Sequence, residues 1–248
     1  MTISGFIITL KTYYQDVIVC SVVLSVAWVM LYSFIAPPIT TMMIKKLFSD
    51  DADHGLIYKW TKYEDISPYI KVCALASEDQ NLPFHYGIDI EAIEKALAVN
   101  KKGRKTFGAS TITQQVAKNA FLFPARNFIR KGLEVYFGIL IEVIWSKERI
   151  LETYLNIAEM GPKVFGVGAA AQYYYKKSAI KLSLQESAGI IAILPNPVKY
   201  NLKKPGPYIS ERRGEITSLF YQLDGTNYLR ELYIKSEESL YDFKKYKK

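Results

Sequence analysis

The stretch NFIRKGLEVYFGILIEVIW, residues 127–145, has the most regular hydrophobic pattern in the chain. Its apolar side chains recur at positions i, i+4, i+7, i+8 and i+11, which lie on one face of an α-helix: Leu133, Phe137, Leu140, Ile141 and Ile144. Such a stripe predicts an amphipathic helix that buries one side against a core. The pattern therefore favours a helical domain.

Capping signals predict further helices on the amino-terminal side of this stretch. Ser67 and the proline that follows it predict a helix that begins there and ends near Glu78. Asp89 predicts the start of a second helix, which carries three apolar side chains on one face: Ile90, Ile93 and Leu97. Thr111 with Gln114 has the spacing of a capping box at the start of a third helix.

The carboxyl-terminal side continues in the same way. Ser146 predicts the start of a helix that stops at Gly161, and Ser183 with Glu186 forms another capping-box pattern. Strand signals are weak, and beyond Tyr221 the sequence predicts only a short helix near the end. The predicted fold class is mainly α.

One apolar run precedes this domain. Residues 17–36 read VIVCSVVLSVAWVMLYSFIA, and as a helix these about 20 residues span roughly 30 Å, the thickness of a bilayer core. A cleaved signal peptide is the alternative, but the run exceeds the usual length of its apolar core and no Ala-x-Ala site follows. The positive charges on the two sides of the run are nearly balanced, with Lys11 before it and Lys45 and Lys46 after it. The positive-inside rule therefore gives little indication of which way the helix crosses the membrane.

Composition narrows the possible partners. The 248 residues include 32 Lys and Arg against 24 Asp and Glu, a formal charge of +8 that favours an anionic partner: nucleic acid, a phospholipid surface or a phosphorylated substrate. No basic stripe with interleaved aromatic residues indicates a nucleic-acid binder. The two cysteines, Cys20 and Cys73, are too far apart in the sequence for a CxxC pair and argue against a zinc site.

Three segments carry polar groups that a helical domain does not need. The first is EDQNLPFHYG, residues 78–87, where Glu78 and Asp79 follow a helix and precede a loop. A partly buried carboxylate at such a helix end can act as a general base. The alternative is a solvated acidic pair at a helix terminus.

The second segment is GASTITQQVAKN, residues 108–119, at a predicted helix start. Free amide groups and hydroxyl donors at such a start favour an anion such as a pyrophosphate. The candidate substrate-binding residues are Gly108, Ser110, Thr111, Gln114, Gln115, Lys118 and Asn119. The alternative is an ordinary capped helix with a polar face.

The third segment is RNFIRKGLE, residues 126–134, in which the cations Arg126, Arg130 and Lys131 precede Glu134. Arg130 and Lys131 lie four and three residues before this carboxylate, so they can hold it ionised and neutralise a phosphate nearby. The alternative is a surface ion pair contributing about 0.3–0.5 kcal/mol.

Together the three segments resemble the peptidoglycan glycosyltransferase family, which monofunctional transglycosylases share with the first domain of bifunctional penicillin-binding proteins. Residues 78–87 look like EDxxFxxHxG, residues 108–119 fit GxSTxxQQxxKN, and residues 130–134 fit RKxxE, within a likeness that covers roughly Lys59 to Asn201. The chain is most similar to the monofunctional members, because no SxxK signature of a transpeptidase is present.

The resemblance departs from the family pattern at three positions. Leu82 replaces the phenylalanine that is usual in the family, and Phe84 replaces a glutamate that is common there. Leu133 occupies a position where some relatives carry lysine. The first two are expected to alter the packing of the loop that presents Glu78. The third is expected to weaken one phosphate contact.

The resemblance implies a lysozyme-like helical domain with one transmembrane helix and a small jaw in the membrane, seated by apolar residues around Met42 to Phe48. It implies residues 1–16 as a short cytoplasmic amino terminus, 17–36 as the transmembrane helix, 37–58 as a connector and 59–248 as the glycosyltransferase domain. The implied location is the inner (cytoplasmic) membrane, with the catalytic domain on its outer, periplasmic side.

The implied reaction polymerises lipid II into β-1,4-linked glycan with inversion and releases undecaprenyl pyrophosphate. Glu78 would be the base, Glu134 would orient the cations, and Lys118, Arg126, Arg130 and Lys131 would stabilise the leaving group. A divalent cation, Mg²⁺ or Mn²⁺, could assist at the pyrophosphate. Partners are lipid II, the growing glycan, the membrane and proteins of the division or elongation machinery.

Two other functions stay open from the sequence. A lytic enzyme that cleaves finished cell-wall glycan could use one glutamate as a general acid on a similar scaffold. A membrane-tethered scaffold protein without catalysis could bind the precursor without turnover.

Overall fold

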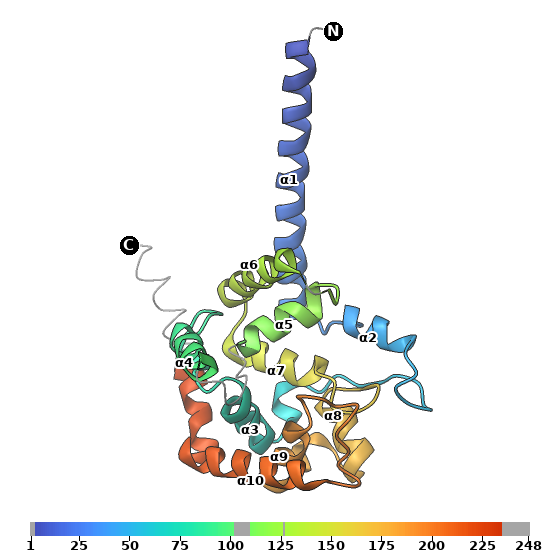
Figure 1. Cartoon of the computed structure of the whole chain (residues 1–248), viewed down its shortest axis with the longest axis vertical. Coiled ribbons are helices and arrows are strands. Elements are labelled where there is room, and N and C mark those ends of the chain that lie inside the picture. Colours follow the sequence, from blue (N-terminus) through green and yellow to red (C-terminus); the bar gives the residue numbers. More distant parts are fainter. Residues whose placement is uncertain (1–2, 102–109, 126, 235–248) are drawn as a thin grey trace. The chain divides into compact units, whose positions relative to one another are not determined.

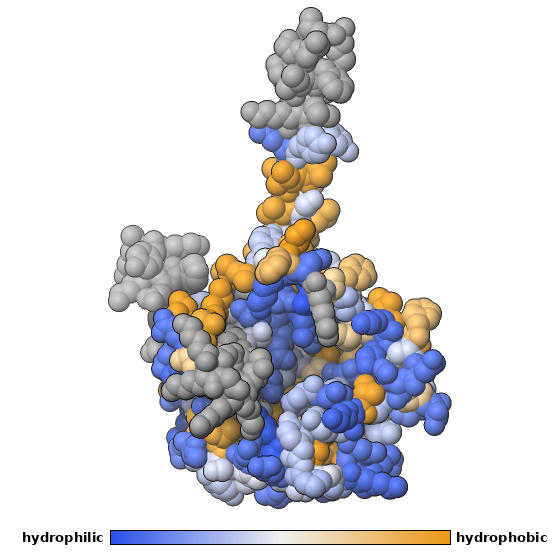
Figure 2. All heavy atoms as spheres, in the orientation of Figure 1, coloured by the Kyte–Doolittle hydropathy of each residue, from blue (hydrophilic) through white to orange (hydrophobic). Residues whose placement is uncertain are grey.

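The structure is a computed structural model that describes residues 3–101, 110–125 and 127–234. It divides into two units, Met1–Ala36 and Pro37–Lys248. The first unit is the helix α1, Ile3–Phe34, and its part from Tyr13 to Phe34 is long and apolar enough to cross a membrane. Apolar side chains cover much of this part (Figure 2). By length and composition, α1 is a candidate membrane anchor.

The second unit is mainly helical (Figure 1). Its helices are α2 (Thr41–Leu47), α3 (Pro68–Glu78), α4 (Ile90–Lys101), α5 (Ile112–Phe121), α6 (Phe128–Ile144), α7 (Lys147–Ile157), α8 (Val167–Ala170), α9 (Leu184–Ala192) and α10 (Pro207–Gln222). Two short strands, β1 (Ile57–Tyr58) and β2 (Val164–Phe165), pair in parallel. A π-helical turn, Ala171–Tyr175, follows α8, and 3-10 turns lie at Tyr63–Asp65, Leu82–Phe84, Ala179–Lys181 and Gly225–Tyr228. The structure confirms a mainly α fold.

The predicted caps explain where most helices begin. The Ser67 hydroxyl accepts a hydrogen bond from the Tyr69 amide at the start of α3, and Ser146 caps α7 in the same way. Ser183 and Glu186 form a full capping box at the start of α9. These side chains satisfy amide groups that the first turn of a helix leaves without partners.

The core lies where α3 packs against α9 and α10, and where α5 packs against α6 and α7 (Figure 1). In α3 the side chains of Ile70, Val72 and Leu75 are fully buried. Because α3 ends at Glu78, this buried helix fixes the position of the carboxylate at its carboxyl end. The helix α2 packs against α5 and lies in the stretch predicted to be only a connector.

Three details of the sequence-based prediction are wrong. The buried face of α6 consists of Glu134, Phe137, Gly138 and Ile141, so it is rotated from the predicted stripe and leaves Leu133 42% exposed. The rotation places a carboxylate, rather than a leucine, against the domain. In addition, α7 ends at Ile157 instead of Gly161, and Ile90 and Leu97 of α4 are exposed while the small Ala96 is buried.

Candidate active site

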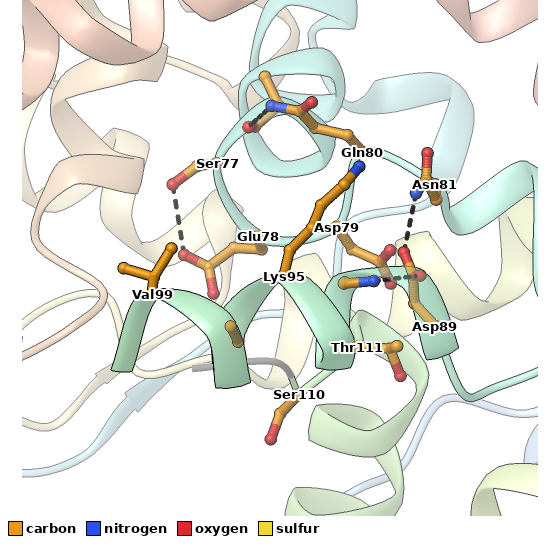
Figure 3. Close-up of a pocket in the computed structure, with 13 residues that line it drawn as sticks. Ser77, Glu78, Asp79, Gln80, Asn81, Asp89, Lys95, Val99, Ser110 and Thr111 are labelled. Atoms are coloured by element: carbon orange, nitrogen blue, oxygen red, sulfur yellow. Dashed lines mark hydrogen bonds between the residues drawn. The ribbon is translucent and has the colours of Figure 1, made fainter. Parts of the chain in front are cut away.

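Glu78 lies at the last turn of α3 and lines a cavity of about 390 Å³ (Figure 3). The side chain is half-buried. Its Oε2 accepts a hydrogen bond of 3.0 Å from Gln115 Nε2 on α5, and its Oε1 accepts one of 3.3 Å from the Ser77 hydroxyl. The carboxylate is thus held from two sides while it faces a space that a substrate can enter. The cavity is also lined by Asp79, Gln80, Asn81, Asp89, Lys95, Val99, Ser110 and Thr111.

Asp79 differs from its neighbour because it is almost completely buried. Its Oδ2 accepts a hydrogen bond of 2.8 Å from the Ile112 amide, and its Oδ1 lies 2.9 Å from His85 Nε2. The Gly87 amide donates to His85 Nδ1, so the ring proton is on Nε2 and is donated to Asp79. Asp79 therefore joins α3, the following loop and the start of α5, and the solvated-pair alternative is wrong for it.

A second buried network holds the same loop. Lys147 Nζ donates to the His85 carbonyl at 2.5 Å and to Glu142 at 2.6 Å, and Glu142 also accepts a hydrogen bond of 2.6 Å from Thr113. These bonds connect α5, α6 and α7 to the loop that follows Glu78. Because buried polar groups with satisfied partners rigidify a site, the position of Glu78 is set by several elements at once.

Positive charge gathers around a different cavity of about 490 Å³. Lys45, Lys118 and Arg130 line it, from α2, α5 and α6 respectively. Its other lining residues are Thr41, Met42, Asn119, Leu122, Pro124 and Ala125. Three cations from three helices around one cavity favour an anionic ligand. We call this cavity the cation pocket.

Lys118 connects the cation pocket with Glu78. Burial lowers the pKa of Lys118, the negative charges of Glu134 and Glu78 act against this shift, and the charges of Arg130 and Lys131 add to it. Gln115, which bonds Glu78, lies one turn before Lys118 on α5. Residues three apart in a helix share a face. Glu78, which is bonded to Gln115, and Lys118 therefore lie on the same face of α5.

Glu134 is buried, with 4% of its surface exposed, and it holds two cations. Arg130 Nη1 lies 2.7 Å and Lys131 Nζ 3.1 Å from its carboxylate oxygens. Lys131 Nζ also donates to Gln114 Oε1 at 3.4 Å. Glu134 thus fixes the two cations of α6 beside α5. These ion pairs fit a role in positioning Arg130 and Lys131 rather than direct contact with a sugar.

The remaining predicted residues divide between the two cavities. Ser110 lines the Glu78 cavity and is exposed, whereas Thr111 caps α5 and donates to the Gly87 carbonyl at 2.7 Å. Asn119 lines the cation pocket. Gly108 and Arg126 lie outside the described residues.

Sequence reasoning missed Lys45 and Ser77. Lys45 lies in the predicted connector, where no motif marks it, and Ser77 is a small polar residue inside a helix. Only the packing of α2 on α5 and of α10 on α3 gives these two residues a place at the site.

The sequence matches a known family. The model of the transglycosylase family matches residues 47–219. The chain belongs to the transglycosylase family. This membership confirms the family predicted from the three motifs and a lysozyme-like helical domain, and it confirms the prediction that the protein is a glycosyltransferase.

Curated relatives cover most of the chain. The biosynthetic peptidoglycan transglycosylase of Pseudomonas entomophila is 46% identical over 84% of this chain and 89% of its own length. Its namesake from Pseudomonas aeruginosa is 42% identical over 84% of this chain and 91% of its own. That of Xanthomonas campestris pv. campestris is 41% identical over 83% and 85%.

A divalent cation in this transglycosylase stays a prediction. The described residues include no group of three or more His, Cys, Asp or Glu side chains that could hold a metal ion. The charged residues that line the cation pocket, Lys45, Lys118 and Arg130, are all positive.

Proposed function

We propose that this transglycosylase acts on lipid-linked peptidoglycan precursors and polymerises lipid II into β-1,4-linked glycan, with Glu78 as the catalytic base. The observation that carries the proposal is that a carboxylate and a group of cations lie beside each other on one face of α5. A half-buried carboxylate faces one cavity, and a cluster of cations surrounds the other. A glycosyl transfer from a pyrophosphate needs both a proton acceptor and stabilisation of an anionic leaving group.

Glu78 takes the proton from the 4-hydroxyl of the acceptor sugar. The hydroxyl oxygen forms a bond to the anomeric carbon of the donor from the face opposite the pyrophosphate. The bond between that carbon and the pyrophosphate oxygen breaks, and its electron pair leaves with undecaprenyl pyrophosphate. Attack from the opposite face turns an α-linked donor into a β-linked product. Gln115 supports this step because its amide fixes one oxygen of Glu78.

The cation pocket stabilises the charge that develops on the pyrophosphate. Lys118 is the central group, because it is partly buried and makes no ion pair among the described residues. Arg130 and Lys45 line the same cavity, and Glu134 keeps Arg130 in place. Fixed cations in a partly buried site stabilise a developing negative charge more strongly than cations in water do.

We also propose that α1 crosses the inner membrane once, with residues 1–16 in the cytoplasm and the catalytic domain outside. The exposed apolar side chains of the domain support a seat on the lipid surface: Ile44, Leu47 and Phe48 near α2, and Phe123, Phe128 and Ile129 before and within α6. Apolar side chains gather on the surface of α6 (Figure 2). Met43, which was expected to take part, is fully buried and belongs to the core instead.

A polymerisation assay tests the function. The full-length protein in detergent or vesicles is supplied with lipid II in one reaction and with finished glycan in another. Growth of polymer from lipid II supports the proposal, and its cleavage by a β-1,4-specific muramidase supports inversion. Shortening of finished glycan would instead indicate the lytic alternative, and binding of lipid II without turnover would indicate a scaffold. Protein partners in division or elongation remain a prediction.

A further inference from the structure

The helix α10 reaches the catalytic base through one serine. Arg212 of α10 donates from Nη2 to the Ser77 hydroxyl oxygen at 2.8 Å. The Ser77 hydroxyl in turn donates to Glu78 Oε1 at 3.3 Å, the bond drawn between these two residues in Figure 3. Arg212 also donates from Nη1 to Glu215 at 2.9 Å. A residue 134 positions further along the chain than Glu78 is therefore two hydrogen bonds from it.

The direction of these bonds follows from the chemistry of the donors. A guanidinium group has only donors, so Ser77 accepts from Arg212 with its oxygen lone pair. The single hydroxyl proton of Ser77 is then left to donate to Glu78, which as a carboxylate has only acceptors. A positively charged donor at Ser77 polarises the hydroxyl and strengthens the second bond.

The two oxygens of Glu78 are held by different helices. Ser77, backed by Arg212 of α10, binds Oε1, and Gln115 of α5 binds Oε2. With both oxygens engaged, the plane of the carboxylate is fixed, and the remaining lone pairs are directed into the cavity. A base that is held in one rotamer is aligned with the proton that it takes.

We propose that Ser77 and Arg212 are positioning residues that hold the Glu78 carboxylate in its reactive orientation. This inference rests on the proposed function, because it assumes that Glu78 is the base. In this proposal Ser77 acts through its hydrogen bond to Glu78, and Arg212 acts through Ser77. Lys118 of α5 and Tyr154 of α7 interact electrostatically with Glu78. Three other charged residues line the same cavity as Glu78: Asp79, Asp89 and Lys95 of α4.

The proposal predicts a loss in kcat rather than in substrate binding. Ser77→Ala removes the hydroxyl donor, and we expect kcat for lipid II polymerisation to fall about tenfold while KM stays within roughly twofold. The ionised form of the carboxylate loses a donor, so the acid limb of the profile of kcat against pH moves to higher pH. Ser77→Thr keeps the hydroxyl and should retain most of the activity.

A double-mutant cycle tests the connection to α10. Arg212→Ala alone should lower kcat several-fold, and the double variant with Ser77→Ala should be no slower than Ser77→Ala, because Arg212 acts through Ser77. Glu215→Gln is the matched control: it removes the other partner of Arg212 and should leave kcat unchanged. Thermal unfolding of each variant identifies a loss of folded protein.

The outcomes separate this inference from the proposed function. An inactive Glu78→Gln with an unchanged kcat and pH profile in Ser77→Ala would overturn the inference alone. Fully additive losses in the cycle would also overturn it. An active Glu78→Gln would overturn the choice of base itself. If Ser77→Ala fails to fold, a pH profile of Arg212→Ala that matches the native enzyme's would contradict the inference, and an acid limb shifted to higher pH would support it.

Discussion

The Glu78 cavity and the cation pocket, which lie along the same face of α5, differ in how their charged groups are paired. On the side of Glu78, each carboxylate has donors: Gln115 and Ser77 for Glu78, and Ile112 with His85 for Asp79. In the cation pocket, Lys118 and Lys45 make no ion pair with any described residue. The two carboxylates at the Glu78 cavity thus have hydrogen-bond partners within the protein, whereas the cation pocket has an excess of positive charge.

This difference shows what each side does. A base must be oriented before the substrate arrives, so its partners belong to the protein. A phosphate site must remain open to its ligand, so its partner comes from outside. Burial lowers the pKa of Lys118, because removal from water disfavours the charged form of the lysine. Variants on each side should therefore fail in different ways.

The largest expected effect is on the Glu78 side. Glu78→Gln keeps the shape and can still bind Gln115, but it cannot accept the proton. We expect polymerisation to fall by at least about 10³-fold, with lipid II binding and the unfolding temperature nearly unchanged. Single-turnover polymerisation and calorimetry measure the two quantities. Residual activity near that of the native enzyme would refute the base.

Asp79→Asn is the matched comparison, because it changes the adjacent carboxylate. Asp79 is bonded to the Ile112 amide and to His85 and does not depend on substrate. The variant should lose about 1–3 kcal/mol of stability, since a buried network loses a charged acceptor. An Asp79→Asn protein that is fully stable but inactive would mean that the division between the two carboxylates is wrong.

The second effect lies in the cation pocket. Lys118→Ala removes a partly buried cation of the cation pocket and should cost about 2–4 kcal/mol of transition-state stabilisation. Lys95→Ala is the control: this lysine lines the Glu78 cavity but is exposed and paired with Glu91 at 2.6 Å. Steady-state kinetics should show a large loss in kcat/KM only for Lys118→Ala. Equal losses would remove the distinction between the two cavities.

The sequence predicted the order of the helices around the site and most of their starts. Ser67, Ser146 and Ser183 cap helices as expected, because a cap depends on neighbours in the chain. The three motifs likewise predicted Glu78 and Lys118, which the structure brings to one face of α5. Local pattern and resemblance were sufficient for these features.

The rest depends on packing, which no local pattern contains. Leu133 was assigned to the buried face of α6, but the contact with α5 selects a face rotated toward Glu134. The pairing of Gln114 with Thr111 predicted a reciprocal capping box, yet the Gln114 side chain binds Lys131 instead. Arg212 and Lys45 have no signal in the sequence because they reach the site only through contacts between distant helices.

A smaller effect is expected at Lys45. It is exposed on α2, so its interaction with a phosphate is screened by solvent, and Lys45→Ala should lower kcat/KM about tenfold or less. Lys45→Arg keeps the charge and should restore most of the loss. Higher salt should reduce the difference between the native and Ala proteins. No change in kcat/KM at low salt would exclude Lys45 from the phosphate site.

The smallest effect is a shift in pH dependence. An ordinary lysine has a pKa of 10.5, and burial lowers that of Lys118. The cation is present below its pKa and is lost as the pH rises through it, so kcat/KM should fall on the alkaline side earlier than an ordinary lysine would allow. Lys118→Arg keeps its charge over this range, so its alkaline limb should lie at higher pH even if its maximum rate is lower. Lys45→Ala, as the control, should keep the native limb. If the native and Lys118→Arg proteins had identical alkaline limbs, the limb would come from the titration of another group. The charge of Lys118 would then not be what binds the anionic leaving group in the cation pocket.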